Sequence, residues 1–209
     1  LEEIERKDKV IIVIDSIGNL ASKKELQDAK DEKSVADMSR AKALKGLFRM
    51  VTPHLNLKDI PMVAINHTYD SQGLYPTKVV SGGTGMYYSA DTIWIVGRQQ
   101  DKVGAEIQGY HFVINVEKSR FVREKSKIPI SVSWENGVDN SSGLLDMALD
   151  YGVISRSGGW YQMVDPETGA VDDKKFREKE THSMEFWETL LADSKFNDFL
   201  KKKYRVGIR

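Results

Sequence analysis

The sequence predicts an α/β protein whose mixed sheet is parallel at first and antiparallel later, followed by a small C-terminal α+β domain. The first observation is the run Val10–Ile14, because unbroken branched apolar residues are typical of a strand buried on both faces of a parallel sheet. A second short apolar run, Met62–Ile65, indicates another buried strand. Later in the chain, apolar runs separated by short polar turns indicate an antiparallel meander.

In the first part of the chain, Val10–Asp15 is the predicted first strand, and the polar residues 16–34 are predicted to form a long loop. An amphipathic helix is expected from Val35 to about Thr52, where Pro53 would end it. Its apolar residues recur at the spacing of one helix face: Leu44, Leu47, Phe48 and Val51. After the second strand, Thr68 to about Gly85 is expected to be a long loop, and loops of that length inside a domain tend to be functional.

The second part begins with the meander. Its strands are predicted at Thr92–Arg98, Tyr110–Lys118 and Ile128–Trp134. Residues 137–142 look like a boundary, so we expect domains at 1–140 and 141–209. In the second domain, the predicted elements are helices at Leu144–Tyr151, Glu185–Ala192 and Phe196–Tyr204, and a hairpin that joins Trp160–Met163 to Ala170–Val171.

Composition limits the class of protein. The 209 residues carry equal numbers of acidic and basic side chains, a balance that argues mildly against a nucleic-acid binder. Zero cysteines exclude disulfides and thiolate metal sites and fit a cytoplasmic protein. No apolar run is long enough for a membrane helix, so no membrane partner is expected. Because the chain starts without Met, we expect a fragment or a processed chain.

The first candidate site lies where the two parallel strands end. Asp15 follows the first strand, and Asn66 and His67 follow the second, at the edge where open α/β folds bind ligands. An acid in this position is typical of a Walker B strand, whose Asp holds Mg²⁺ for a nucleotide. The alternatives are an ordinary buried strand and a solvent-facing loop histidine. Gly-Lys-Ser and Gly-Lys-Thr do not occur, so the chain has no phosphate-binding P-loop.

The long loop is the second candidate site. It carries Tyr69, Tyr75 and Lys78 and then the glycine-rich run 81–85. Aromatic and basic residues interleaved with glycine suit contact with a nucleic acid, and the glycines also resemble a phosphate nest. The alternative is a plain surface lid.

A pair of cations, Lys118 and Arg120, follows the second meander strand. Residues at i and i+2 of an extended chain point to one side, so the two could clamp a phosphoryl oxygen. The alternative is that they are edge-strand charges that block aggregation. The sequence contains no G-x-S-x-G nucleophile motif, and its four histidines lack metal-ligand spacing.

Taken in order, these pieces resemble the RecA-type homologous recombinases, most closely those of the T-even phages. The resemblance rests on the runs 14–25, 39–42, 65–69, 82–85, 88–92, 109–110, 115–120 and 142–149. It implies a partial RecA-like (P-loop NTPase) core, ATP and Mg²⁺ bound between subunits, and self-association into a filament on single-stranded DNA. It also implies a phage-infected bacterial cytoplasm as the place of action.

The resemblance further implies roles for single residues. Asp15 would coordinate Mg²⁺ with Ser16 beside it in the nucleotide site. Asn66 and His67 would sense the γ-phosphate, although many relatives have Gln in place of His67. Lys118 and Arg120 would reach a neighbouring subunit's ATP. The DNA-binding residues would be Lys23, Lys24, Arg40, Tyr69, Tyr75, Lys78, Gly82 and Gly83.

The family's Walker A loop, catalytic Glu and N-terminal polymerisation segment have no counterpart in this sequence. We therefore expect this chain alone to bind no ATP tightly and to hydrolyse none. The leading interpretation is a piece of an ATP-dependent DNA strand-exchange protein. The alternatives are a non-catalytic RecA-like module that binds DNA or a partner, and one half of a split recombinase.

Overall fold

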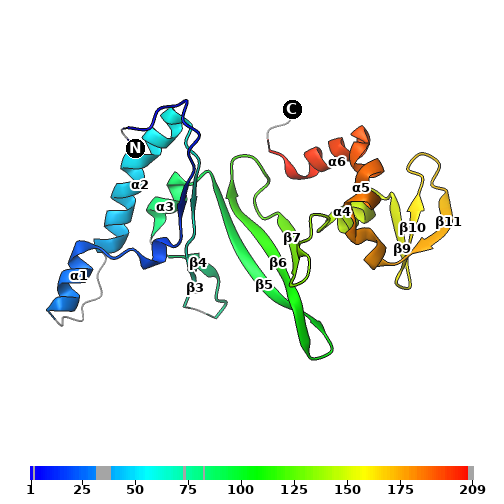
Figure 1. The fold of residues 1–209 in the computed structure, drawn as a ribbon, viewed down its shortest axis with the longest axis horizontal. Helices are drawn as coiled ribbons and strands as arrows, with labels where there is room; N and C mark the ends of the chain where they lie inside the picture. Colours follow the sequence, from blue (N-terminus) through cyan, green and yellow to red (C-terminus); the bar gives the residue numbers. More distant parts are fainter. Residues whose placement is uncertain (2, 32–38, 73, 82, 207–209) are drawn as a thin grey trace. The chain divides into compact units, whose positions relative to one another are not determined.

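The fold was obtained as a computed structural model that describes residues 1, 3–31, 39–72, 74–81 and 83–206. It is a mixed α/β structure with several small sheets, and its contacts divide the chain into residues 1–91 and 92–209 (Figure 1). A parallel strand pair precedes the antiparallel strands, as predicted, but the prediction of one mixed sheet is wrong, because the described strands form separate small sheets.

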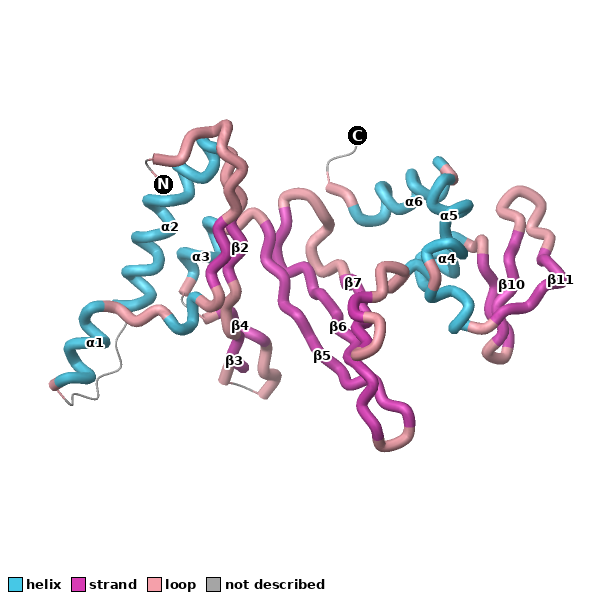
Figure 2. Tube along the Cα trace, in the orientation of Figure 1, coloured by secondary structure: helices cyan, strands magenta, loops and turns pink. Residues whose placement is uncertain are grey.

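In residues 1–91, β1 (Ile12–Ile14) pairs in parallel with β2 (Met62–Ala64). The helices α2 (Ser39–Lys58) and α3 (Thr84–Ser89) pack beside this pair (Figure 2). The buried cluster consists of Ile17, Leu44, Phe48 and Met86, with Ile14, Val51 and Met62 packed against it.

The prediction that the first strand is buried on both faces is wrong. Val13 is 61% exposed, and Val63, its partner in register, is 51% exposed. Ile14 packs against the buried cluster, whereas Val13 points to the opposite face because successive side chains of a strand alternate. Within the described residues, the helices therefore cover one face of the strand pair.

Two predicted boundaries are wrong. The supposed loop 16–34 contains the 3₁₀ turn η1 (Ile17–Asn19) and the helix α1 (Lys23–Lys30). Helix α2 continues past Pro53, which removes one backbone N–H donor but lies on an exposed part of the helix where water can solvate the freed carbonyl. The predicted start of this helix, residues 35–38, lies outside the described residues.

The segment 68–85 is also more ordered than predicted. The strands β3 (Thr68–Asp70) and β4 (Lys78–Val80) form an antiparallel hairpin. Gly83, with φ of +79°, precedes α3, and a positive φ of this size is readily adopted by glycine.

In residues 92–209, the predicted meander is confirmed as a four-stranded sheet in the order β5-β6-β7-β8. Its strands are Thr92–Val103, Glu106–Ser119, Lys127–Ser133 and Gly137–Val138. The Oγ of Ser142 accepts a hydrogen bond of 2.8 Å from the N–H of Ser131, which ties the next segment to β7. The predicted domain boundary at residue 140 stays a prediction.

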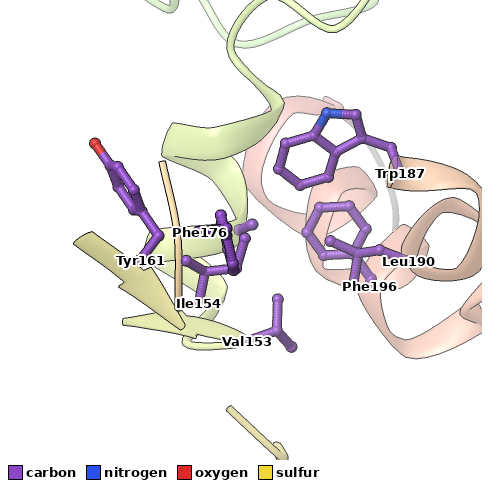
Figure 3. Packing of buried hydrophobic residues seen from close by; sticks show 8 residues of the cluster. Val153, Ile154, Tyr161, Phe176, Trp187, Leu190 and Phe196 are labelled. Carbon is purple, nitrogen blue, oxygen red and sulfur yellow. The ribbon is translucent and has the colours of Figure 1, made fainter. Parts of the chain in front are cut away.

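The predicted helices and hairpin of the last segment are confirmed. The helices are α4 (Leu144–Tyr151), α5 (Met184–Ala192) and α6 (Ser194–Tyr204), with a 3₁₀ turn η2 at Glu178–His182. The antiparallel sheet contains β9 (Ile154–Ser157), β10 (Trp160–Val164) and β11 (Val171–Phe176). Strand β9 was not predicted. Figure 3 shows the apolar core between the helices and the β9–β11 sheet. In this core, Trp187 is 1% exposed and Phe196 is 0% exposed.

Candidate functional site

The ends of the two parallel strands meet at one sheet edge. Ile14 lies in register with Ala64, and the N–H of Ile65 donates to the carbonyl of Ile14 over 2.9 Å. One turn later, the N–H of Ile17 donates to the carbonyl of Ile65, also over 2.9 Å. The pairing therefore brings the residues after β1 beside those after β2, as the sequence predicted for Asp15 and His67.

Ser16 and His67 contact one another at this edge. The Oγ of Ser16 lies 3.3 Å from Nε2 of His67, and Ser16 is only 5% exposed. Asp15, joined to Ser16 by a cis peptide bond, is exposed to solvent. The hydroxyl is thus engaged with the imidazole, and the carboxylate remains open to a cation.

The donor set fits Mg²⁺ only in part. Magnesium in nucleotide sites takes one or two carboxylates and completes its shell with water and phosphate oxygens. Asp15 can supply one such carboxylate, but no group of three or more metal-ligating side chains occurs in the part of the chain that the structure describes. The described residues therefore provide one ligand and do not by themselves form a magnesium-nucleotide site.

Arg40 fastens the turn that follows Asp15. Its Nη2 donates to the carbonyl of Ile17 over 3.0 Å and to the carbonyl of Gly18. Its Nε is buried and has no hydrogen-bond partner among the described residues. The guanidinium thus holds the turn beside His67, which was not predicted from the sequence. The predicted DNA contact of Arg40 stays a prediction.

Gly18 lies directly against His67. A Cβ at residue 18 would overlap Cδ2 of the imidazole, so this position accepts only a residue without a side chain unless the ring moves. The imidazole of His67 is therefore in van der Waals contact with the Ile17-Gly18 turn and within hydrogen-bond distance of Ser16. Nothing in the local sequence marked Gly18, because its neighbour His67 follows a strand that is distant in the sequence.

Asn66 closes the base of the β3–β4 hairpin. Its Nδ2 donates to the carbonyl of Ser81 over 2.7 Å, and its Oδ1 accepts the N–H of His67 over 2.9 Å. The N–H of Ser81 also donates to the carbonyl of His67 over 3.0 Å. The residues that follow β2 are therefore bonded both to the sheet edge and to the hairpin.

The hairpin presents aromatic side chains to solvent. Tyr69 is 56% exposed, and Tyr75, in the connection between the strands, is 87% exposed. Lys78 forms an ion pair of 2.8 Å with Asp70 across the hairpin. Three of the predicted DNA-binding residues therefore share one small element, Gly83 lies after it, and Gly82 lies outside the described residues.

Two further predicted DNA-binding residues open helix α1. Lys23 and Lys24 occupy its first turn, where the helix dipole disfavours cations. A capping box between Ser22 and Glu25 stabilises this end, and Lys24 lies 4.0 Å from Asp28. The two lysines are exposed to solvent, so their unfavourable interaction with the helix dipole is small. Their exposure also leaves them accessible to an anionic ligand.

Lys118 and Arg120 belong to the second part of the chain. Lys118 lies near the end of β6, paired with Ile93, and Arg120 follows the strand in a turn. In that turn, the Oγ of Ser119 accepts the N–H groups of Phe121 and Val122, each over 3.1 Å. The predicted extended arrangement of the two cations is therefore interrupted, because the chain turns directly after Ser119.

No helix among the described residues combines the length and the apolar composition that a bilayer span requires.

Comparisons with known proteins agree with the resemblance. Residues 141–200 match a family model described as the C-terminal domain of the recombination and repair protein of bacteriophage T4. Over 99% of its length the chain is 51% identical to that T4 protein, UvsX, and covers 54% of it. It is also 26% identical to the RecA protein of Tropheryma whipplei, over 76% of this chain and 37% of that protein. It is 25% identical to the RecA protein of Aquifex pyrophilus, over 76% of this chain and 46% of that protein. The chain thus spans about half the length of the curated relatives it matches.

Proposed function

Since this chain is UvsX-like and RecA-related, we propose that it forms part of an ATP-dependent recombinase that assembles on single-stranded DNA and promotes strand exchange in recombination and repair. The observation that carries this proposal is the position of Asn66 and His67. They join the sheet edge at Asp15 to the base of the exposed aromatic hairpin. In an infected bacterium, such a protein would act in the cytoplasm.

The DNA-binding surface is the β3–β4 hairpin together with the start of α1. Tyr69 and Tyr75 offer exposed rings for base stacking, and such stacking contributes about 1–3 kcal/mol per base. Lys23 and Lys24 offer exposed cations for the phosphates, and each neutralised phosphate makes binding more salt-dependent. Stacking and phosphate contacts are both indifferent to sequence, as coating of a single strand requires.

The nucleotide site belongs to a larger assembly. In it, Asp15 would contribute one ligand to Mg²⁺, with Ser16 beside it, and Asn66 and His67 would lie toward the γ-phosphate. Lys118 and Arg120 would serve the site of a neighbouring subunit in a filament. We expect the chain to supply part of a RecA-like core followed by a C-terminal domain, and without a P-loop sequence we expect it to bind no ATP tightly on its own.

One observation also favours the non-catalytic alternative. The hairpin and the start of α1 are built from this chain's own residues, so we expect the chain to bind single-stranded DNA without a nucleotide. The chain would then act as a DNA-binding module or as one half of a split recombinase. Joining it to the part of the T4 protein that it does not match, and measuring DNA-stimulated ATP hydrolysis, distinguishes these cases.

The decisive experiment measures fluorescence anisotropy of a labelled oligo-dT strand with the intact chain. Tyr75→Ala should weaken binding by about tenfold, because one stacked base is lost. Leu74→Ala is the matched control, since Leu74 is 92% exposed in the same connection but has no aromatic face. Equal binding by wild type and Tyr75→Ala, or equal weakening by both variants, would contradict the proposed surface.

A nucleotide titration with the chain alone completes the test. We expect no saturable binding of Mg²⁺-ATP at micromolar concentration, because Asp15 is a single ligand and the P-loop sequence is missing. Micromolar affinity would overturn this part of the proposal.

A further inference from the structure

The segment that follows α6 pairs with the turn that carries Arg120. Val122 and Arg205 form an antiparallel β-bridge. The N–H of Arg123 donates to the carbonyl of Tyr204 over 2.7 Å, and the N–H of Val206 donates to the carbonyl of Phe121 over 3.2 Å. Residues 204–206 therefore act as a short strand laid along the 120–123 turn.

The same turn is fastened on its other side to the sheet. The N–H of Lys125 donates to the carbonyl of Val116 over 2.7 Å, and the N–H of Ser126 donates to that of Arg123 over 3.3 Å. The hydroxyl of Ser119 caps the two N–H groups that follow Arg120. The turn that carries Arg120 is thus bonded to β6 on one side and to residues 204–206 on the other.

Helix α6 anchors residues 204–206 in the apolar core. Phe196 on this helix is fully buried, and its ring lies 5.3 Å from that of Tyr151 on α4. Lys203 forms an ion pair with Asp150, also on α4. Residues 204–206 are therefore connected through α6 to the packing in the last segment of the chain.

We propose that residues 204–206 are a positioning element for Arg120, so that the packing of α6 on α4 sets the direction of this guanidinium. The inference rests on the proposed role of Arg120 at a neighbouring subunit's nucleotide. In this proposal, residues 204–206 affect the neighbouring subunit's nucleotide site through the backbone of the turn that carries Arg120. Arg120 touches the ligand in this scheme, and residues 204–206 act only through it.

Val206→Pro tests the pairing in the intact chain. Proline has no N–H, so it removes the hydrogen bond to Phe121. Arg205 already has φ of −76° and ψ of 148°, the extended conformation that a residue before proline prefers, so the preceding residue need not change its conformation. Val206→Ala keeps the N–H and is the matched control.

Hydrogen exchange of the amides of residues 121–126 is the first measurement. We expect Val206→Pro to raise their exchange by about tenfold, as loss of one hydrogen bond implies, while Val206→Ala leaves it unchanged. The amides of 154–164 should not change in either variant, which verifies that the rest of the segment stays folded. Unchanged exchange in Val206→Pro overturns the positioning element.

The second measurement is DNA-stimulated ATP hydrolysis by the chimera with the unmatched part of the T4 protein. Reduced hydrolysis for both Arg120→Ala and Val206→Pro, with normal hydrolysis for Val206→Ala, supports the inference. Reduced hydrolysis for Arg120→Ala alone overturns the positioning role and leaves the proposed function intact. Normal hydrolysis for Arg120→Ala overturns the proposed function of that residue and the inference with it.

Discussion

The hydroxyl of Ser16 lies 3.3 Å from Nε2 of His67, although 51 positions separate the two residues in the chain. Parallel pairing of β1 with β2 places them at one sheet edge. Gly18 lies against the same imidazole, and Arg40 holds the turn that carries Gly18. The ring of His67 is therefore positioned by contacts from two distant segments.

Gly18→Ala should displace the imidazole of His67, because the added methyl group would occupy the space of the ring. We expect loss of the contact with Ser16 and a destabilisation of about 1–3 kcal/mol, the range for overpacked sites. The measurement is the imidazole resonances of His67 together with denaturant unfolding.

Gly46→Ala is the matched control for this change. Apart from its chain neighbours and the nearby backbone of its own helix, no described atom lies within 4 Å of a Cβ at Gly46, and alanine in a helix is more stable than glycine by about 0.5–1 kcal/mol. This variant should therefore be at least as stable as wild type. If Gly18→Ala leaves both the imidazole resonances and the stability unchanged, the turn at Gly18 does not fix the position of His67.

Asn66→Ala should loosen the base of the hairpin, because the side chain bonds both Ser81 and the N–H of His67. Loss of these bonds should cost about 1–3 kcal/mol locally and increase hydrogen exchange at Ser81. Ser71→Ala is the control, since it removes contacts with Thr77 at the far end of the hairpin. An equal effect of the two variants at Ser81 would contradict the role of Asn66.

Asp165 should confer an acid-dependent stability on the β10–β11 connection. The N–H groups of Thr168 and Glu167 donate to its Oδ1 over 2.8 and 2.9 Å and hold its pKa below the ordinary value of 3.8. Because the folded pKa is lowered, the contribution is complete well above pH 3.8 and is lost as the pH falls through the folded value.

An NMR titration of the Thr168 amide checks this prediction. The resonance should move as Asp165 is protonated, with a midpoint below 3.8. Asp165→Asn should abolish that movement and reduce the acid dependence of unfolding. A midpoint at or above 3.8 would show that the two N–H groups do not stabilise the carboxylate.

Phe196→Ala should strongly destabilise the last segment, because Phe196 is fully buried and packs on Tyr151 and Phe199. Substitutions of this kind cost about 3–5 kcal/mol in a core. Phe121→Ala, at a residue that is 63% exposed, should change the free energy of unfolding by no more than about 0.5 kcal/mol. Similar losses in the two variants, measured by denaturant unfolding, would contradict the assigned core.

The sequence by itself determined the elements whose patterns are local. The meander and the helices α4, α5 and α6 follow from periodic apolar residues and turn residues, and their predicted positions are confirmed. The convergence of Asp15 and His67 was also predictable, because parallel strands end at one edge. The order of motifs was enough to indicate the relationship to recombinases.

Tertiary structure decided what depends on contacts between distant segments. Three features depend on which element lies opposite: the exposure of Val13, the hydrogen bond from Arg40 to the turn at Ile17, and the contact of Gly18 with His67. No local sequence pattern specifies the opposite element. The bridge between Val122 and Arg205 is a backbone contact, so side-chain identity carries little signal for it. Local periodicity reports which face of an element is apolar, whereas the partner of that face is chosen by packing of the whole chain.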